Sequence, residues 1–414
     1  MDDDTRSQNM VTEELQNKPE TTTGGGFRSL KDLLDRVTGR GLQPPGAVEE
    51  SGIAESLPFP FLAIVGQREM KLALLLALIN PAIGGVLLIG PRGTGKTTAV
   101  RSLVDLLPLV PKSLCYYGCM PEDIEAGGMD AVCPDCAKKY AEGQPLFKLD
   151  KVRLVELPLN ARLEDVVGGL DERATIQERL RLKRGLLAQA DRNLLYVDEI
   201  NLLSDEVMDA LLDASAQGTY TVRRGPVSAT YWSRMVLIGS MNPEEGKLRP
   251  QIQDRFGLRV VVRGLDDIHE RLEAYMRVHG FLMNRRRAIA QFQQETEYAR
   301  VEIEAARNMV HQVVLPENIA QLGLKIIQSL QIDSLRAEIT LFEAARAHAA
   351  ADARQSVTIE DIEQVALMSL RLRRSQFIID YLEQQRSEDE EIRKIQNAIL
   401  AETGYEPVNK SVIT

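Results

Sequence analysis

One short segment constrains the fold of this chain more than any other. Residues 90–97 read Gly-Pro-Arg-Gly-Thr-Gly-Lys-Thr and directly follow the apolar run at 85–89. The spacing matches the phosphate-binding pattern G-x-x-x-x-G-K-[ST] at every specified position, in the strand context that the pattern requires. Its glycines allow backbone N–H groups to approach phosphate oxygens, and the helix expected from Lys96 adds the positive end of its dipole. The segment therefore predicts a nucleotide-binding α/β domain.

The residues of this loop have separate expected roles. We expect the ammonium group of Lys96 to contact the β- and γ-phosphates of ATP, and the hydroxyl of Thr97 to ligate Mg²⁺. A chance glycine turn is the structural alternative, and the strand before the loop argues against it. The residues expected around the nucleotide are Gly90, Arg92, Gly93, Thr94, Gly95, Lys96 and Thr97.

A second apolar strand, at 193–197, ends at the acidic pair Asp198 and Glu199. This is the pattern of a Walker B strand, in which Asp198 would hold Mg²⁺ through water and Glu199 would act as general base toward the attacking water. Hydrolysis needs both groups, because a metal ion neutralises phosphate charge without orienting the nucleophile. An apolar run ending in two acids is also a common way for a strand to end. The pair gains its significance from the complete loop before it.

Two further polar residues follow in the order expected of an ATPase. Residues 235–241 form another strand of the buried type, and its polar end can place Asn242 beside the γ-phosphate. Arg255 suits contact with the ATP of a neighbouring subunit, since a guanidinium is always charged and can bind two phosphate oxygens. A surface ion pair is the alternative for a single arginine. An arginine supplied in trans requires a ring of identical subunits.

All four cysteines lie in one stretch, as Cys115, Cys119, Cys133 and Cys136. Paired short spacings allow four thiolates to surround one tetrahedral Zn²⁺ ion, and Gly127-Gly128 would help the intervening loop to turn. Reduced thiols, a redox pair and an iron–sulfur cluster are the alternatives. Because the stretch follows the helix after the phosphate loop, we expect a zinc ion there to brace a loop and to take no part in chemistry.

Composition limits the class of protein further. The 414 residues suffice for a large nucleotide domain and a smaller second domain. The sequence contains no run of roughly 18 apolar residues, so we expect no membrane span. Its start, Met-Asp-Asp-Asp, argues against secretory and transit signals. We therefore expect a cytoplasmic protein. The net charge of −10 gives no general attraction for nucleic acid, although a local basic patch is compatible with it.

Changes in composition and in the spacing of apolar residues divide the chain into five predicted segments. Residues 1–56 are polar, with Thr-Thr-Thr-Gly-Gly-Gly at 21–26, and predict a disordered leader with a short helix at 30–37. Residues 57–265 alternate strands and helices, which indicates a mainly parallel sheet between helices, with the cysteine-rich insertion at 113–145. A long connecting helix at 285–313 is expected within 266–314, a helical lid at 315–372 and a charged helical tail at 373–414. Thr358 and Asp361 form a capping box in the lid.

With these motifs the chain resembles the AAA+ ATPases, and more closely the ATPase subunit of magnesium chelatases, over roughly residues 58–373. The resemblance rests on Ala-Ile-Val-Gly-Gln at 63–67, Asn-Pro-Ala-Ile-Gly-Gly-Val at 80–86, Leu-Tyr-Val-Asp-Glu-Ile-Asn-Leu-Leu at 195–203 and Asn-Pro-Glu-Glu-Gly at 242–246. It implies an α/β AAA+ P-loop core, with a parallel sheet flanked by helices and a C-terminal helical lid. In Leu-Arg-Ala-Glu at 335–338 it implies that Arg336 reaches back from the lid to the nucleotide.

The same resemblance implies an activity and partners. ATP hydrolysis by a homo-oligomeric ring, most simply a hexamer, would drive insertion of Mg²⁺ into protoporphyrin IX. An adaptor subunit with AAA+ and integrin-like domains and a large porphyrin-binding subunit would take part. Two stretches depart from the family pattern: residues 179–187 lack the aromatic and proline expected before Gly185, and Thr-Tyr-Trp-Ser-Arg at 230–234 replaces a His-Pro-Ala-Arg string.

These departures keep other classes open. A MoxR-like remodelling ATPase would work with an integrin-domain partner on an unrelated protein complex. A nucleotide-dependent scaffold without hydrolysis is a second alternative, and the intact Lys96, Asp198 and Glu199 argue against it. The sequence identifies the ATPase more firmly than the molecule on which it acts.

Overall fold

The computed structural model describes residues 57–115, 118–170, 182–225, 227–246, 248–374, 384 and 387–396. The leader at 1–56 and its expected helix lie outside these residues. The chain divides into the units Met1–Ser56 and Leu57–Thr414, and the description below concerns the second. In the tail, residues 387–396 are helical.

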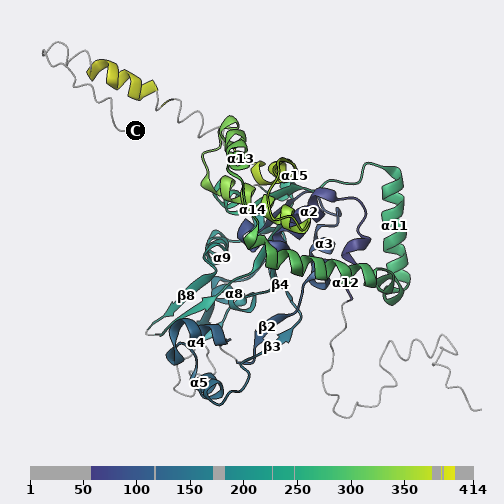
Figure 1. Cartoon of the computed structure of the whole chain (residues 1–414), viewed down its shortest axis with the longest axis vertical. Helices are drawn as coiled ribbons and strands as arrows, with labels where there is room; N and C mark the ends of the chain where they lie inside the picture. Colours follow the sequence, from purple (N-terminus) through teal and green to yellow (C-terminus); the bar gives the residue numbers. More distant parts are fainter. Residues whose placement is uncertain are drawn as a thin grey trace, which may run out of the picture. The chain divides into compact units, whose positions relative to one another are not determined.

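A parallel five-stranded sheet forms the centre of this unit (Figure 1). In spatial order its strands are β11 (Leu258–Val261), β1 (Val86–Ile89), β10 (Val236–Met241), β7 (Leu194–Val197) and β4 (Leu154–Leu157). Every neighbouring pair is parallel. Strands β1, β7 and β10 are buried at every position, as expected for parallel strands with helices on both faces.

Two cores cover the two faces of the sheet. Alternate residues of β1 belong to different cores, since Val86 and Leu88 pack on one face and Leu87 and Ile89 on the other. The first core includes the helices α2 (Arg68–Ile79) and α3 (Lys96–Ser102), and the second includes α9 (Asp205–Gln217) and α10 (Pro250–Arg255). This arrangement confirms the expected α/β fold class.

The C-terminal helices follow the sheet, and all but the first of them share its first core. They are α11 (Ile268–Met283), α12 (Arg285–Met309), α13 (Glu317–Ser329), α14 (Leu335–Ala351) and α15 (Ile359–Leu370). Helix α12 begins where the sequence predicts and gives way to the 3₁₀ turn η7 (Val310–Gln312) before Pro316. Thr358 and Asp361 form the expected capping box at the start of α15. The lid therefore packs directly against the nucleotide domain.

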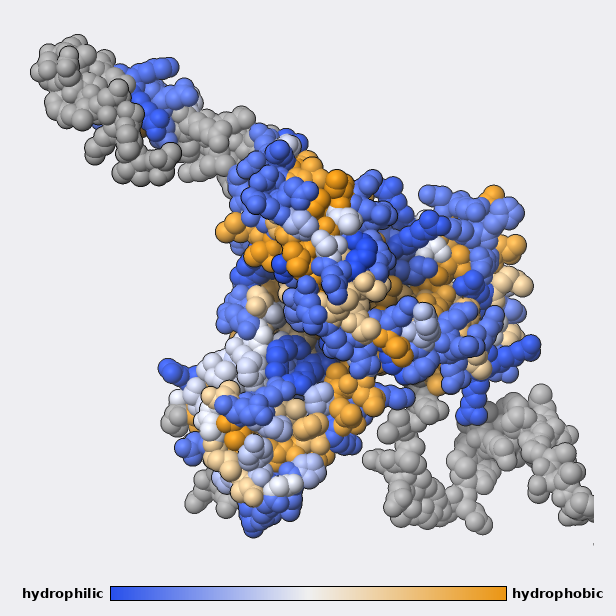
Figure 2. Space-filling model, in the orientation of Figure 1, coloured by the Kyte–Doolittle hydropathy of each residue, from blue (hydrophilic) through white to orange (hydrophobic). Residues whose placement is uncertain are grey.

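Apolar side chains also gather on the outside of the lid (Figure 2). They line a groove between α13 and α15 that includes Leu322, Ile326, Leu330, Ile359 and Leu367. Leu367 and Ile359 are each more than half exposed. The groove is an open margin of the lid core.

Among the described residues, three antiparallel pairs of strands project from the sheet. Strands β2 (Val110–Ser113) and β3 (Phe147–Asp150) close the cysteine insertion, which contains α4 (Pro121–Gly127) and α5 (Pro134–Ala141). The pairs β5 (Gly168–Leu170) with β6 (Leu182–Arg184), and β8 (Thr219–Arg224) with β9 (Val227–Trp232), form the other two. The shorter elements are α6 (Leu163–Val167), α8 (Leu186–Gln189), η1 (Phe61–Ala63), η2 (Pro81–Ile83), η3 (Leu103–Leu106), η4 (Met129–Ala131), η5 (Ile200–Leu202) and η6 (Pro243–Glu245).

Candidate active site

The phosphate loop lies between the carboxyl end of β1 and the start of α3. Gly93 and Gly95 have φ values of +79° and +85°, and a Cβ atom added at either would meet nothing within 4 Å. Glycine is therefore needed for backbone conformation, and the space beside the loop stays open for a ligand. Gly90 is needed for packing, because its Cβ would lie 2.2 Å from the carbonyl oxygen of Val262. The loop has the open cradle that phosphate binding requires.

Lys96 is held at the mouth of this cradle. Its Nζ donates to the carbonyl oxygens of Gly90 and Pro91, each at 2.7 Å. Burial lowers the pKa of Lys96, and the nearby carboxylates of Asp198, Glu245 and Glu199 oppose that shift. Phosphate oxygens are stronger acceptors than these two carbonyls, so the ammonium group is placed to exchange one set of acceptors for the other.

Asp198 follows β7, which is separated from β1 in the sheet only by β10, so its side chain lies near the start of α3. Its Oδ2 accepts from Thr97 Oγ1 at 3.3 Å, and its Oδ1 accepts from Tyr196 Oη at 2.9 Å and from Ser240 Oγ. Burial raises the pKa of Tyr196, so its hydroxyl remains a donor. A hydroxyl and a carboxylate oxygen side by side are the hard ligands that Mg²⁺ prefers. The pair Thr97 and Asp198 fits the expected metal site.

Tyr196 and Ser240 do not appear among the residues expected from the sequence. Each is a polar residue two positions before a predicted site residue on a buried strand, since Tyr196 precedes Asp198 and Ser240 precedes Asn242. A polar group on a fully buried strand needs a hydrogen-bond partner. That requirement is the sequence signal that identifies them.

Glu199 lies beside the loop, where it is paired with Arg92. The Arg92 guanidinium contacts Glu199 Oε1 at 3.0 Å and also the carboxylate of Glu245. Glu245 is a further residue of the site that was not predicted from the sequence. Glu199 has a φ of +51°, a strained conformation for a residue with a side chain. Arg92 is 72% exposed, so ligand phosphates can compete for its charge and release the glutamate.

Asn242 follows β10 at the same edge of the sheet. The strand end is tied to the phosphate loop, because Gly90 N–H donates to Met241 O at 3.0 Å. The Asn242 side chain is buried, and its Oδ1 accepts from the Glu244 N–H at 3.3 Å to cap η6. The structure thus brings Lys96, Thr97, Asp198, Glu199 and Asn242 together at the carboxyl edge of the sheet.

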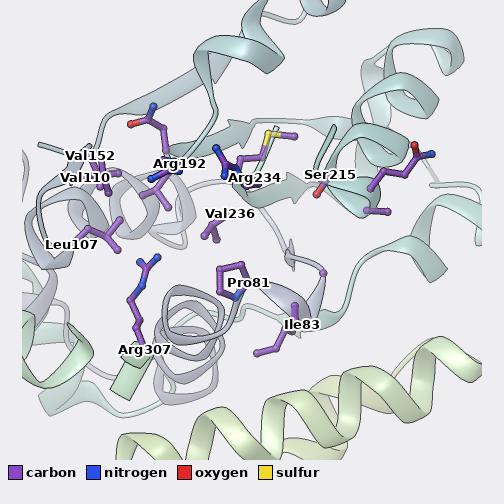
Figure 3. Close-up of a pocket in the computed structure, with 18 of the residues that line it drawn as sticks. Pro81, Ile83, Leu107, Val110, Val152, Arg192, Ser215, Arg234, Val236 and Arg307 are labelled. Carbon is purple, nitrogen blue, oxygen red and sulfur yellow. The ribbon is translucent and has the colours of Figure 1, made fainter. Parts of the chain in front are cut away.

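Arg255 and Arg336 lie at the opposite edge. They line a cavity of about 780 Å³ together with Gly84, Leu194 and Val236, which stand at or just before the first residues of their strands. Figure 3 shows Val236 among the side chains that line this cavity. Four residues of strand span about 13 Å, so this cavity is separated from the phosphate loop by the depth of the sheet.

The two arginines are held by ion pairs near that cavity. Arg255 contacts Asp213 at 2.9 Å and Asp209 at 3.4 Å on α9, and Arg336 lies 3.7 Å from Asp254. Arg336 therefore lies away from the phosphate loop of its own chain. The physical reason is that α14 packs against α2 and against η2, which immediately precedes β1. Its first turn therefore meets the amino edge of the sheet.

The four cysteine sulfurs converge within the insertion. All four Sγ atoms lie within 4.8 Å of one another, and burial raises the pKa of Cys119 to about 12. Among the described residues a second group of metal-ligand types, His348, Asp352 and Asp361, lies in the lid. There the guanidinium of Arg354 already pairs with Asp352 and Asp361, so that group is an ion-pair network.

Comparisons with known proteins agree with this architecture. The model of an AAA domain matches residues 84–225, and the model of an AAA lid domain matches residues 324–395. Together with the parallel sheet, the phosphate loop and the acidic strand, these matches define an AAA+ ATPase.

Relatives narrow the class. A magnesium-chelatase subunit ChlI homolog of Methanocaldococcus jannaschii is 42% identical, over 77% of this chain and 87% of its own length. The magnesium-chelatase 38 kDa subunit of Acidiphilium rubrum is 42% identical over 76% of this chain and 90% of its own. The magnesium-chelatase 38 kDa subunit of Chlorobaculum tepidum is 35% identical over 92% of this chain and 97% of its own length. The chain belongs to the family of magnesium-chelatase ChlI subunits.

One solved structure is also similar to this chain. A chain in a structure of the complex between magnesium-chelatase subunits BchI and BchD is 36% identical, covers 79% of this chain and 99% of its own length, and has a TM-score of 0.44. In the part of the chain that the structure describes, no helix is long and apolar enough to cross a membrane.

Proposed function

We propose that this protein is the ATP-hydrolysing motor subunit of a magnesium chelatase, and that its ATPase cycle drives insertion of Mg²⁺ into protoporphyrin IX. The observation that carries the proposal is the convergence of Lys96, Thr97, Asp198 and Glu199 at one edge of the sheet, in a chain of the ChlI family. Its proposed ligands are ATP and Mg²⁺ at this edge and a structural Zn²⁺ ion at the four thiols.

At the carboxyl edge each residue has one proposed task. Backbone N–H groups of the loop and Lys96 bind the phosphates, and Thr97 and Asp198 supply oxygen ligands to Mg²⁺. The metal ion, when bound, neutralises charge on the phosphate oxygens. Glu199 orients the attacking water and accepts its proton, and Asn242 donates to the γ-phosphate. Arg92 moves from Glu199 to the phosphates, which couples nucleotide binding to release of the base.

The arginines of the opposite edge act on a neighbour in this proposal. Arg255 and Arg336 share one cavity and lie far from the phosphate loop of their own chain. In a ring, a protomer's amino-edge face meets the next protomer's nucleotide, so both arginines would contact that ATP in trans. By analogy with the family, we propose that this ring is a hexamer.

In this proposal the motor subunit acts on the porphyrin through other subunits. We propose an adaptor subunit with AAA+ and integrin-like domains and a separate large subunit that binds the porphyrin. Among the described residues, the chain offers no cluster of oxygen or nitrogen ligands for a substrate metal apart from the nucleotide site and the lid ion pairs. Division of labour between motor and insertion subunit accounts for this.

The decisive experiment combines ATPase and insertion assays. The protein is mixed with the adaptor and porphyrin-binding subunits of a related magnesium chelatase, and both ATP turnover and magnesium-protoporphyrin fluorescence are measured. Glu199→Gln should lower both rates about 10²- to 10⁴-fold, because general-base catalysis contributes that much. It should leave nucleotide affinity nearly unchanged.

Glu295→Gln is the matched control, since Glu295 is an exposed residue of α12. Its rates should equal those of the unmodified protein. Glu199-dependent ATPase without insertion would contradict the chelatase assignment and favour a remodelling ATPase. Turnover that survives Glu199→Gln would contradict the assignment of the base.

A further inference from the structure

The insertion that carries the four cysteines is built around their sulfur atoms. Cys115 Sγ lies 3.8 Å from Cys119 Sγ and 3.5 Å from Cys133 Sγ. Disulfide sulfurs are separated by about 2.05 Å, so these are distinct thiols. Four sulfurs at about 2.3 Å from a tetrahedral Zn²⁺ ion would be about 3.8 Å apart. The spacing is that of a tetrahedral thiolate site.

The polypeptide around the sulfurs is organised as in a metal-binding knuckle. Cys119 and Cys133 stand just before the helices α4 and α5, whose first residues are prolines, and Cys136 lies in the first turn of α5. The Cys133 N–H donates to Cys119 Sγ at 3.4 Å, as backbone amides do toward thiolate ligands. Ligands from two loops and one helix start are thus brought to a single point.

Apolar packing in the insertion is slight. The buried members of its core are Cys119, Val132, Cys136 and Leu146, so half of that core is sulfur ligands. So few apolar residues bury too little surface to order more than thirty residues of chain, and natural modules of this size add a metal ion or disulfides. The insertion therefore needs its sulfur cluster to hold a fixed structure.

Helix α4 connects this cluster to the β8–β9 hairpin. Asp123 Oδ1 accepts from the indole Nε1 of Trp232 at 2.7 Å, and Glu122 Oε2 accepts from Arg234 at 3.1 Å and from Arg192. The Arg234 guanidinium also lies 4.3 Å from the centre of the Trp232 ring. These contacts begin three residues after Cys119.

We propose that Cys115, Cys119, Cys133 and Cys136 bind one structural Zn²⁺ ion, and that the ion fixes α4 as a clamp on the β8–β9 hairpin. Arg192 and Arg234, the two arginines that the clamp holds, line the cavity at the amino edge of the sheet (Figure 3). Zinc thereby sets one wall of that cavity. The proposal stands independently of the proposed chelatase activity, because its site and its contacts lie outside the nucleotide site.

The metal is tested by elemental analysis of the full-length protein purified without added metal. We expect about one zinc ion per chain, and loss of that zinc in Cys115→Ser/Cys133→Ser, because two ligands cannot complete a tetrahedral site. Thiol titration should find four reactive groups only after chelator treatment. Absence of zinc, or iron with visible absorbance in its place, would overturn the zinc site.

The clamp is tested through Trp232, which is the chain's single tryptophan. Removal of zinc from the unmodified protein by chelator should shift the tryptophan emission to longer wavelength, as the indole loses Asp123 and gains water. Added zinc should reverse the shift. Asp123→Asn should retain zinc but weaken the contact to the indole, so its emission should respond less to chelation.

ATP binding provides the check on folding. The chelated protein should still bind nucleotide, because the phosphate loop makes none of the contacts described for the clamp. An emission spectrum unchanged by zinc removal would overturn the clamp even if zinc were present. Loss of zinc and of nucleotide binding together would also overturn it, since the ion would then support the whole domain.

Discussion

The two edges of the parallel sheet differ in how complete they are within one chain. At the carboxyl edge, the phosphate loop, Asp198, Glu199 and Asn242 form a contiguous set joined by hydrogen bonds. At the amino edge, Arg255 and Arg336 are among the residues that line a cavity away from the phosphate loop. In the ring that we propose, the first edge binds the nucleotide and the second supplies arginines to the site of a neighbouring chain. A single chain carries both halves, but they face apart.

The largest effect is expected from removing the arginine of the second edge. Arg255→Ala should lower ATP turnover about 10³- to 10⁵-fold, the range for loss of an arginine supplied to a transferring phosphoryl group. Nucleotide affinity, measured by fluorescent ATP-analogue binding, should change little, because the carboxyl edge is intact. Turnover measured with purified rings checks the prediction.

Mixing two inactive variants tests whether the edges cooperate between chains. Arg255→Ala and Lys96→Ala damage opposite edges, so an equimolar mixture should regain activity at roughly a quarter of its randomly formed interfaces. Lys96→Ala mixed with Glu199→Gln is the control, because both variants damage the same edge and no interface is complete. Absence of recovery in the first mixture would mean that the halves do not meet in trans.

A smaller effect is expected from Asp254, which joins the lid to the amino edge. Its carboxylate contacts Arg373 at 2.6 Å and Arg259 at 3.5 Å, and both arginines have fully buried side chains. Burial, with the charge of Arg373, lowers the pKa of Arg259 to about 9, and Asp254 opposes that shift. Asp254→Asn should reduce the free energy of unfolding by roughly 2–4 kcal/mol, because it leaves two buried guanidinium groups without their counter-charge.

Urea denaturation at neutral pH measures this loss. Asp266→Asn is the matched control, since Asp266 is exposed and a surface substitution of this kind changes stability by less than about 0.5 kcal/mol. Equal midpoints for the two variants would show that the buried arginines are stabilised by their carbonyl contacts alone, such as Arg373 with Phe256 O and Gly257 O.

The same difference between the edges explains what sequence reasoning could achieve. The carboxyl edge was predictable, because Lys96, Asp198 and Asn242 follow apolar strands and parallel strands place their carboxyl ends together. The fold class followed from the same strands. The position of Arg336 was not predictable. The family motif at 335–338 identifies the residue, but the packing of α14 on η2 decides which edge of the sheet it meets.

Pairwise contacts across long separations were also beyond the sequence. Arg92 is read as a phosphate ligand from its place in the loop, yet it pairs with Glu199, a residue 107 positions away. The contact between Trp232 and Asp123 joins residues 109 positions apart. Periodicity and motif spacing describe local structure, and such pairs depend on how distant elements pack.

The smallest effect is expected at Ser240, a positioning residue of the carboxyl edge. Its hydroxyl donates to Asp198 and accepts from the Glu199 N–H at 3.3 Å, and its side chain is buried. Ser240→Ala should therefore free the Asp198 carboxylate to rotate. Loss of an outer partner of a metal ligand weakens metal binding about 10- to 100-fold, and we expect the lower end, because Tyr196 still donates to the same oxygen.

The Mg²⁺ concentration that gives half-maximal ATPase at saturating ATP measures this change. Ser102→Ala is the matched control, since Ser102 is equally buried but its hydroxyl donates to backbone carbonyls of α3. If Ser240→Ala lowers turnover without changing the Mg²⁺ requirement, its hydroxyl acts through the Glu199 backbone and not through Asp198. Because Asp198 and Glu199 are adjacent yet have separate tasks, that result would assign the contribution of Ser240 to the base and remove it from the metal site.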